Sequence, residues 1–351
     1  MKSYVLTQFG QPLQPVEAPT PKPTGTEILL KTLAAGVCHS DLHLADGYYD
    51  LGGGKKFTLG DRGINLPITM GHEIAGEVEA IGPEATGVKP GERYVAYPWI
   101  GCGTCATCKA GNEQLCNDAR TLGIRQPGGY ADHVIVPHPR YLYPLGKISA
   151  QAAAPFACSG LTTYAALKRV GAAVYKNQPI LILGAGGLGL MCVKLLKALG
   201  GKGAIVVELD AKKRAAALAA GALAAIDPKA EKPGKAIKQA AGGPLAAAID
   251  LVGASETAQL GIDALARGGK YVIVGLMGGD LTLSLPLLPI RSIAIEGMLV
   301  GTLAEFREVL DLVAAGKVES MPLIERKMAE VNEALADLKA GRVYGRAMLT
   351  P

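Results

Sequence analysis

Residues 179–200 read PILILGAGGLGLMCVKLLKALG, and this stretch decides the fold. The apolar run ILIL has the composition of a buried strand, a glycine-rich turn follows it, and later apolar residues recur at helical spacing. Helical segments, the last of them expected over 255–269, then alternate with four more segments of strand composition: 204–210, 224–227, 245–253 and 270–276. Such alternation is typical of a doubly wound parallel sheet. The sequence therefore predicts an α/β protein in which residues 156–295 form this sheet domain.

The glycine turn matches the G-x-G-x-x-G pattern of dinucleotide-binding domains. Gly184 permits the tight turn, Gly186 lets the backbone approach a pyrophosphate, and Gly189 lets the helix pack closely on the strand. Gly187 and Leu188 complete the turn at the helix N-terminus, whose free N–H groups would face the phosphates. The pattern alone is weak because glycine is abundant, with 46 in 351 residues, so an ordinary turn of an α/β domain is the alternative.

An acidic residue, Glu208, ends the second predicted strand about 20 residues after the glycine turn. At this place a carboxylate accepts hydrogen bonds from both hydroxyls of an adenosine ribose. The same negative charge would repel the 2′-phosphate of NADP. The sequence therefore predicts NAD as the preferred cofactor.

The first 155 residues are rich in glycine and proline and contain four short segments of strand composition: 27–37, 74–82, 91–97 and 132–137. These segments predict an antiparallel, partly open barrel. Residues 47–67 are expected to form a long glycine-rich loop, a kind of loop that is often functional. A last helix over 303–316 and a mixed tail are expected to return to this first domain.

The composition is that of a globular protein, with 49% hydrophobic and 19% charged residues. The net charge of +5 is mild and spread along the chain, which argues against a nucleic-acid partner, and no apolar stretch reaches membrane length. The N-terminal segment lacks the apolar run of a signal peptide. Seven cysteines are an odd number for a disulfide framework, so we expect a reducing, cytoplasmic compartment.

Six of the seven cysteines fall into two groups. The first group follows a C-x2-C-x2-C-x7-C pattern: Cys102, Cys105, Cys108 and Cys116. Unpaired core cysteines would rarely show this spacing, and four thiolates close a tetrahedral zinc site completely, which is the structural type. The second group is dispersed and combines Cys38 and Cys158 with His72. Three ligands leave one position open, as in catalytic zinc sites, but the spacing alone leaves an ordinary polar histidine as the alternative.

Four segments carry a resemblance to a known family: GVCHSDLH at 36–43, GHEIAGEVEAIG at 71–82, the four-cysteine segment, and GAGGLG at 184–189 with its following acid. In this order they resemble the zinc-dependent medium-chain alcohol dehydrogenases over essentially the whole chain, and most of all their tetrameric prokaryotic NAD-dependent branch. The resemblance implies a GroES-like catalytic domain, residues 1–155 and 296–351, that holds both zinc sites. It also implies a Rossmann NAD-binding domain, residues 156–295.

The family's pattern implies roles for single residues near the metal. Cys38, His72 and Cys158 would bind the catalytic zinc, and the four-cysteine segment would bind the structural zinc. Glu73 matches an acid that lies behind the metal and can become a fourth ligand. Asp41 matches the carboxylate that orients the imidazole ligand, which fixes its tautomer and strengthens it.

The pattern also implies a reaction. Ser40 and His43 match a proton relay, and the implied chemistry is the reversible oxidation of primary or secondary alcohols to aldehydes or ketones, with hydride transfer to NAD. The implied protein is a homotetramer that takes a small alcohol or carbonyl substrate and has neither a nucleic-acid nor a membrane partner. Further residues match cofactor contacts: His39 and Arg346 at the pyrophosphate, Thr162 near the nicotinamide and Lys213 near the adenosine ribose.

Trp99 matches a wall residue of the family's substrate pocket. Three more residues are candidates to line this pocket, with ordinary core packing as the alternative: Tyr48, Leu122 and Leu299. An apolar, aromatic wall suits medium-chain, benzylic or cyclic alcohols better than polyols. Sorbitol-type relatives commonly carry an acid at the position of Cys158, and a glutathione-adduct dehydrogenase is a further alternative. Alternatives of another class are a non-catalytic protein that binds zinc and nucleotide, and a nucleic-acid-binding zinc module, which the lack of a basic face disfavours.

Overall fold

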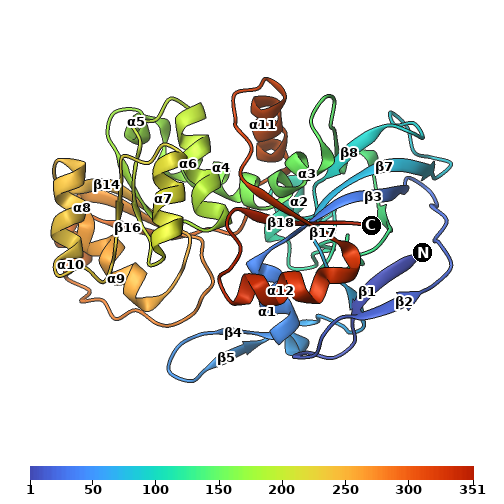
Figure 1. Ribbon diagram of the computed structural model, residues 1–351, viewed down its shortest axis with the longest axis horizontal. Helices are drawn as coiled ribbons and strands as arrows, with labels where there is room; N and C mark the ends of the chain where they lie inside the picture. Colours follow the sequence, from blue (N-terminus) through green and yellow to red (C-terminus); the bar gives the residue numbers. More distant parts are fainter.

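The computed structural model describes residues 1–351 and shows two lobes side by side (Figure 1). One lobe holds a six-stranded sheet in the order β13-β12-β11-β14-β15-β16, in which every neighbouring pair is parallel. Its strands are β11 (Ile180–Leu183), β12 (Ala204–Val207), β13 (Ala224–Ile226), β14 (Leu245–Asp250), β15 (Leu265–Ile273) and β16 (Ala294–Gly297). This is the strand order of a doubly wound sheet, so the predicted fold is confirmed.

Helices α4 (Ser159–Val170) and α5 (Ala172–Tyr175) precede the first of these strands. The helices between the strands are α6 (Gly187–Ala198), α7 (Ala211–Ala219), α8 (Pro233–Ala241), α9 (Ser255–Ala264) and α10 (Leu287–Arg291). The sequence pattern favoured one helix from 255 to 269, and this boundary is wrong. Helix α9 ends at Ala264 because Leu265 already pairs with Leu245 of β14. The register then shifts before Lys270, so the intervening glycine pair lies in an irregularity of the strand.

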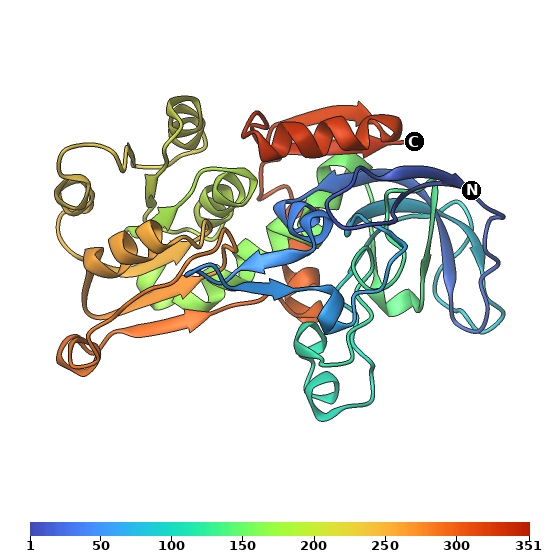
Figure 2. The same ribbon diagram turned by 90° about the horizontal axis from the view of Figure 1, so that it is seen from below.

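The second lobe is built from a seven-stranded and a three-stranded sheet. The long strand β3 (Ile28–Val37) pairs antiparallel with β7 (Glu73–Ile81), β9 (His133–Val136) and β18 (Arg346–Thr350). The C-terminal strand thus lies against a strand near the N-terminus, as Figure 2 shows at the right of the molecule. The domain boundaries at 155/156 and 295/296 stay a prediction. The other strands are β1 (Lys2–Leu6), β2 (Gln14–Glu17), β6 (Ile68–Thr69), β8 (Arg93–Ala96), β10 (Leu142–Pro144) and β17 (Leu323–Lys327).

The structure adds two features to the predicted elements of this lobe. Residues 47–67 are not one open loop, because β4 (Tyr48–Asp50) and β5 (Lys56–Thr58) form an antiparallel hairpin within them. The C-terminal tail contains a helix after the predicted α11 (Leu303–Ala314), namely α12 (Val331–Lys339). The remaining helices are α1 (His39–Asp46), α2 (Ala106–Lys109) and α3 (Ala150–Ala153), and 3-10 turns lie at Gly60–Arg62, Glu113–Leu115, Pro139–Tyr141, Ala154–Ala157 and Met328–Glu330.

Apolar burial holds each lobe together. All four residues of β11 and of β12 are buried, as expected for central parallel strands that are covered on both faces. Helix α12 packs its buried face, which includes Val331 and Leu335, into a cluster that also contains Val37 of β3. The helix therefore closes the core of the lobe that carries both cysteine groups. None of the helices is long and apolar enough to cross a membrane.

Candidate active site

The dispersed residues Cys38, His72 and Cys158 come together in space. Cys38 follows β3 and caps α1, His72 immediately precedes β7, and Cys158 precedes α4. All three side chains are buried, and their ligand atoms lie within 4.8 Å of one another. Because neighbouring strands and a helix start each supply one side chain, tertiary packing alone assembles the group.

The imidazole of His72 shows that this group suits a metal ion. Its side chain is fully buried, and neither ring nitrogen has a hydrogen-bond partner of good geometry. The carboxylate of Asp41 lies 3.3 Å from Nδ1. A buried unpaired nitrogen is costly, and a cation between the imidazole and the two sulfurs would satisfy it. Two sulfurs and one nitrogen are a donor set that zinc prefers and that leaves a fourth position open.

The two sulfurs of the group differ in acidity. Cys38 Sγ and Cys158 Sγ lie 4.0 Å apart. The contact with Cys158 lowers the pKa of Cys38 well below its ordinary value, and the positive charge of Arg346 acts in the same direction. The contact with Cys38 and burial raise the pKa of Cys158 well above its ordinary value. One thiolate is therefore favoured here, and a metal ion would stabilise the second.

Asp41 holds the beginning of α1 against the ligand group. Its Oδ2 accepts hydrogen bonds from the backbone N–H of Cys38 at 2.8 Å and from the hydroxyl of Tyr130 at 2.8 Å. Its Oδ1 is the atom that faces His72. Tyr130 was not a candidate at the level of sequence, because only the folded chain brings residue 130 to residue 41.

Glu73, the residue after the ligand His72, pairs with Arg346. Both side chains are buried, and Nε of Arg346 donates to Glu73 Oε2 at 2.8 Å while its second nitrogen donates to Oε1. The backbone N–H of Ser159 also donates to Oε1, at 3.2 Å. Gly36 leaves room for this carboxylate, since a Cβ there would lie 2.0 Å from Oε2. The part of Glu73 as a fourth metal ligand stays a prediction, and both its oxygens have partners here.

Arg346 also faces the glycine turn. A Cβ added at Gly187 would lie 3.4 Å from a guanidinium nitrogen of Arg346 and 2.8 Å from the carbonyl oxygen of Gly345. One buried arginine therefore pairs with the carboxylate of Glu73 and also lies near the first residue of α6. This placement is compatible with the predicted contact between Arg346 and a pyrophosphate.

The glycine turn fits a dinucleotide. Gly184 follows β11 with φ of 96°, a conformation that favours glycine, and a Cβ at Gly189 would lie 2.1 Å from the carbonyl oxygen of Gly184. At Gly186 an added Cβ would meet nothing within 4 Å, which leaves open space for a phosphate. Glu208 stands beside the turn, because its Oε2 accepts the N–H of Ala185 at 2.8 Å. The turn and the acid thus occupy the two places that the sequence pattern requires.

The other predicted cofactor residues occupy separate positions. Thr162 is buried one helical turn after Cys158, and its N–H donates to the Cys158 carbonyl at 2.8 Å. The Nζ of Lys213 would lie 3.8 Å from a Cβ at Gly341, so this side chain reaches toward the other lobe. His39 is exposed at the start of α1. Their contacts with NAD, and that of the half-buried Leu188, stay predictions.

The predicted relay residues lie one turn apart on α1. The Oγ of Ser40 is 3.8 Å from Cys38 Sγ, and the ring of His43 lies 4.9 Å from that of Tyr49. Burial lowers the pKa of His43, although the charges of Cys38 and Asp46 oppose this effect. The imidazole is therefore neutral at pH 7 and able to accept a proton.

The candidate substrate wall is brought together in part. The ring of Trp99 lies 5.3 Å from that of His72, and its Nε1 donates to the carbonyl of Ala157, the residue before Cys158, at 2.9 Å. Leu122 is buried in the same apolar cluster as Trp99. Tyr48 instead lies under Nζ of Lys56, at 3.7 Å, and Leu299 is 49% exposed. Their lining role stays a prediction.

The four-cysteine group forms a separate site. Its ligand atoms also lie within 4.8 Å of one another, with Cys108 and Cys116 buried and Cys102 and Cys105 partly exposed. Backbone N–H groups of the loop donate to its sulfurs: Cys102 to Cys116 at 3.3 Å, and Cys105 and Cys108 to the preceding cysteine at 3.4 Å. A Cβ at Gly101 would lie 2.4 Å from Cys108 Sγ, so the loop closes around the sulfurs. Four converging thiols suit a structural zinc ion.

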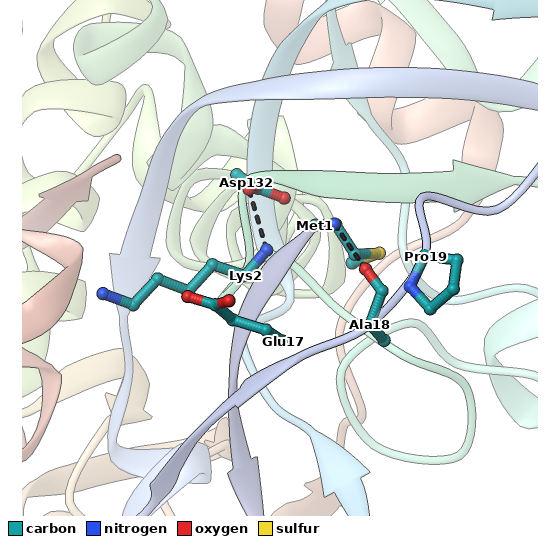
Figure 3. Close-up of a pocket in the computed structure, with 6 residues that line it drawn as sticks. All are labelled: Met1, Lys2, Glu17, Ala18, Pro19 and Asp132. Carbon is teal, nitrogen blue, oxygen red and sulfur yellow. Dashed lines mark hydrogen bonds between the residues drawn. The ribbon is translucent and has the colours of Figure 1, made fainter.

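A hollow of about 510 Å³ lies elsewhere, around the N-terminus (Figure 3). The terminal amine of Met1 donates to the carbonyl of Ala18 at 2.6 Å, and the N–H of Lys2 donates to Asp132 at 2.8 Å. These backbone groups already have partners, and no residue of the cysteine sites or the glycine turn lines the hollow. It is therefore not a candidate active site.

Comparison with known proteins agrees with this geometry. Residues 24–147 match the alcohol dehydrogenase GroES-like domain, and residues 187–315 match the zinc-binding dehydrogenase family. The chain is 39% identical to an NAD-dependent alcohol dehydrogenase of Sulfurisphaera tokodaii and 40% identical to one of Saccharolobus solfataricus, each over 100% of both chains. The crystal structure of the alcohol dehydrogenase from Aeropyrum pernix superimposes with a TM-score of 0.90 at 30% identity, and 100% of each chain is covered.

The chain therefore belongs to the zinc-dependent medium-chain alcohol dehydrogenase family, as its sequence motifs predicted. It is an oxidoreductase with a GroES-like lobe and a Rossmann lobe.

Proposed function

We propose that this protein catalyses the reversible oxidation of primary or secondary alcohols to aldehydes or ketones, with NAD as the hydride acceptor. The observation that carries the proposal is the buried group of Cys38, His72 and Cys158. The carboxylate of Glu73, the residue after His72, is paired with Arg346, whose guanidinium lies near the glycine turn. The protein is an NAD-dependent alcohol dehydrogenase, and its cofactors are NAD and two zinc ions, as the sequence predicted.

Zinc held by Cys38, His72 and Cys158 would supply the Lewis acidity that favours loss of the hydroxyl proton, and NAD would supply the hydride acceptor. The residues of the chain bind and orient these partners. Asp41 Oδ1 faces the His72 ring and would orient it when the ring binds zinc, and the buried side chain of Trp99 lies beside the same imidazole.

Ser40 and His43 are proposed to carry the proton away from the substrate. Both lie on α1, directly after the ligand Cys38. Ser40 is the nearer of the two to the ligand group, and the lowered pKa of His43 makes it an acceptor at neutral pH. We therefore infer that Ser40 lies at the beginning of the relay and that His43 is its base.

The substrate is proposed to be a medium-chain, benzylic or cyclic alcohol. Support comes from Trp99 beside His72 and from the apolar cluster that contains Trp99 and Leu122. Hydrophobic walls with few polar groups select apolar substrates. Cys158 stands where sorbitol-type relatives commonly carry an acid, which argues against polyols.

We also propose that the chain forms a homotetramer in the cytoplasm. Strand β16 is an edge strand of the Rossmann sheet, and several large apolar side chains are exposed on it or near it: Leu276, Met277, Leu285, Leu287, Ile290, Ile295 and Leu299. Exposed apolar surface of this kind is typical of subunit contacts. All seven cysteines are free, which suits a reducing compartment.

A panel of alcohols and carbonyl compounds, each assayed with NAD and with NADP, tests the proposal. We expect the highest kcat/KM with NAD and an apolar alcohol or its ketone. A clear preference for polyols or for the glutathione adduct of formaldehyde would replace the substrate assignment. A protein that binds zinc and NAD but turns over none of these compounds would contradict the catalytic proposal itself.

A further inference from the structure

We infer that Tyr130 is a positioning residue for the metal site of Cys38, His72 and Cys158: its hydroxyl holds one oxygen of Asp41 so that the other oxygen faces His72. The inference deepens the proposed function and rests on it, because it requires zinc at this site. Tyr130 does not reach the ligand atoms itself and acts through Asp41.

The two carboxylate oxygens of Asp41 have different hydrogen-bond partners. Oδ2 accepts from the Tyr130 hydroxyl at 2.8 Å and from the N–H of Cys38 at 2.8 Å, whereas Oδ1 has no hydrogen-bond partner of good geometry and lies 3.3 Å from His72 Nδ1. Two charge-assisted hydrogen bonds hold Oδ2 in place. The free oxygen is thereby aimed at the imidazole, which it can orient when the ring binds a metal.

The ring of Tyr130 supports the same site from the backbone side. A Cβ at Gly71, the residue before His72, would lie 2.5 Å from this ring. The aromatic side chain therefore packs directly on the backbone that leads into the ligand, and both Tyr130 and Asp41 are buried. Tyr130 thus contacts the segment of one ligand through its ring and the carboxylate partner of that ligand through its hydroxyl.

A second tyrosine has a matching place at the four-cysteine site. The hydroxyl of Tyr141 donates to Glu113 Oε2 at 2.8 Å, and the same oxygen accepts the N–H of Gly101, the residue before Cys102, at 3.1 Å. Each group of cysteines is thus flanked by a buried tyrosine–carboxylate pair that holds a backbone N–H at or next to a ligand. The two pairs provide matched variants for an experiment.

The experiment compares Tyr130→Phe with Tyr141→Phe and Tyr97→Phe. Tyr97 is also fully buried, but its hydroxyl donates to the carbonyl of Gly301 and not to a carboxylate. Zinc per chain, the rate of zinc transfer to a chelator, the melting temperature and NADH binding are measured for the three variants and the wild type. The zinc whose departure ends turnover is assigned to the three-ligand site. In a second preparation cobalt replaces the zinc of this site, and its absorption bands report the geometry of the metal ligands.

We expect Tyr130→Phe to release the zinc of the three-ligand site about tenfold faster, the lower end of the effect of removing an outer partner of a metal ligand, and to shift the cobalt bands. In this variant the release of zinc from the four-cysteine site and the binding of NADH should stay as in the wild type. Tyr97→Phe should leave the release of zinc from both sites unchanged. The inference would be overturned if Tyr130→Phe released this zinc at the wild-type rate, or if zinc release were accelerated equally at both sites. A wild-type protein without zinc at Cys38, His72 and Cys158 would instead refute the proposed function.

Discussion

The two cysteine groups differ in how the chain builds them. The four-cysteine site comes from one short loop, in which backbone N–H groups donate to the sulfurs and two of the cysteines remain partly exposed. The three-ligand site comes from three segments that are far apart in sequence, and all of its side chains are buried. A local loop can order itself around a metal, whereas the dispersed site exists only where the whole lobe has already folded.

This difference predicts different consequences of ligand loss. Metal binding contributes folding energy where it orders a loop, and it contributes chemistry where it leaves a position open for substrate. Variants of the two sites should therefore separate stability from turnover.

The largest effect is expected at the three-ligand site. Cys38→Ser should lower turnover by more than about 10³-fold, well beyond the 10–100-fold typical of changes to outer partners of a ligand. The folded protein and its NADH binding should persist, because neighbouring strands hold the segment. Steady-state kinetics and NADH fluorescence check this, with the buried core cysteine variant Cys192→Ala as a control that keeps activity. Retention of substantial turnover by Cys38→Ser would show that this site is not catalytic.

At the four-cysteine site the expected effect is on stability. Cys105→Ser should lower the melting temperature by at least about 5 °C, since the loss of a few kcal/mol moves the transition by several degrees. Subunit assembly should weaken as well, while chains that stay folded retain some turnover. Thermal unfolding of the variant beside the wild type provides the measurement. An unchanged melting temperature together with lost activity would reverse the roles assigned to the two sites.

Cofactor choice extends the comparison to the glycine turn, where a local motif again carries the function. Glu208 should give at least a tenfold preference for NAD over NADP, from two effects of about 1–3 kcal/mol each: hydrogen bonds to the ribose and repulsion of the 2′-phosphate. Glu208→Ala should lower the ratio of kcat/KM with NAD to kcat/KM with NADP, mainly because NAD binds more weakly. Replacing the exposed Glu231 by Ala should leave this ratio unchanged. The kcat/KM values for both cofactors decide this, and equal use of NADP by the wild type would refute the role of Glu208.

The smallest effect is expected at His43. Burial lowers its pKa, so in the wild type the imidazole is neutral near pH 7 and can accept a proton. His43→Gln removes this base, so alcohol oxidation should slow near pH 7 and recover as rising pH supplies hydroxide. The pH profile of a step limited by chemistry is the test. Identical profiles for variant and wild type would exclude His43 from the relay.

The fold and the local motifs could be predicted because their signals lie within short stretches of sequence. The strand, glycine turn and helix at 179–200 indicate the doubly wound sheet, and the spacing of the four cysteines indicates a metal-binding loop. The last helix of the chain, α12, was not predicted from the sequence. Its apolar residues are buried by packing in the same cluster as β3, and this packing is visible only in the folded structure. The end of α9 was misplaced because pairing of Leu265 with Leu245 overrides the local pattern.

The three-ligand site could be predicted only through the family resemblance. Spacing does not reveal that Cys38, His72 and Cys158 meet, because that depends on the antiparallel register of β3 and β7 and on the start of α4. Tyr130 had no signal at all in the sequence, since its partner Asp41 lies 89 residues away. Contacts of this kind follow from tertiary structure alone.

The most direct test of the central claim is the zinc content of the purified wild type, Cys38→Ser and Cys105→Ser, each measured below its melting temperature by elemental analysis. The account predicts two zinc ions per chain in the wild type and one in each variant, with turnover abolished only in Cys38→Ser. An active wild type without zinc, or a Cys38→Ser protein that retains both ions, would contradict the claim that the chain holds two metal sites with separate tasks.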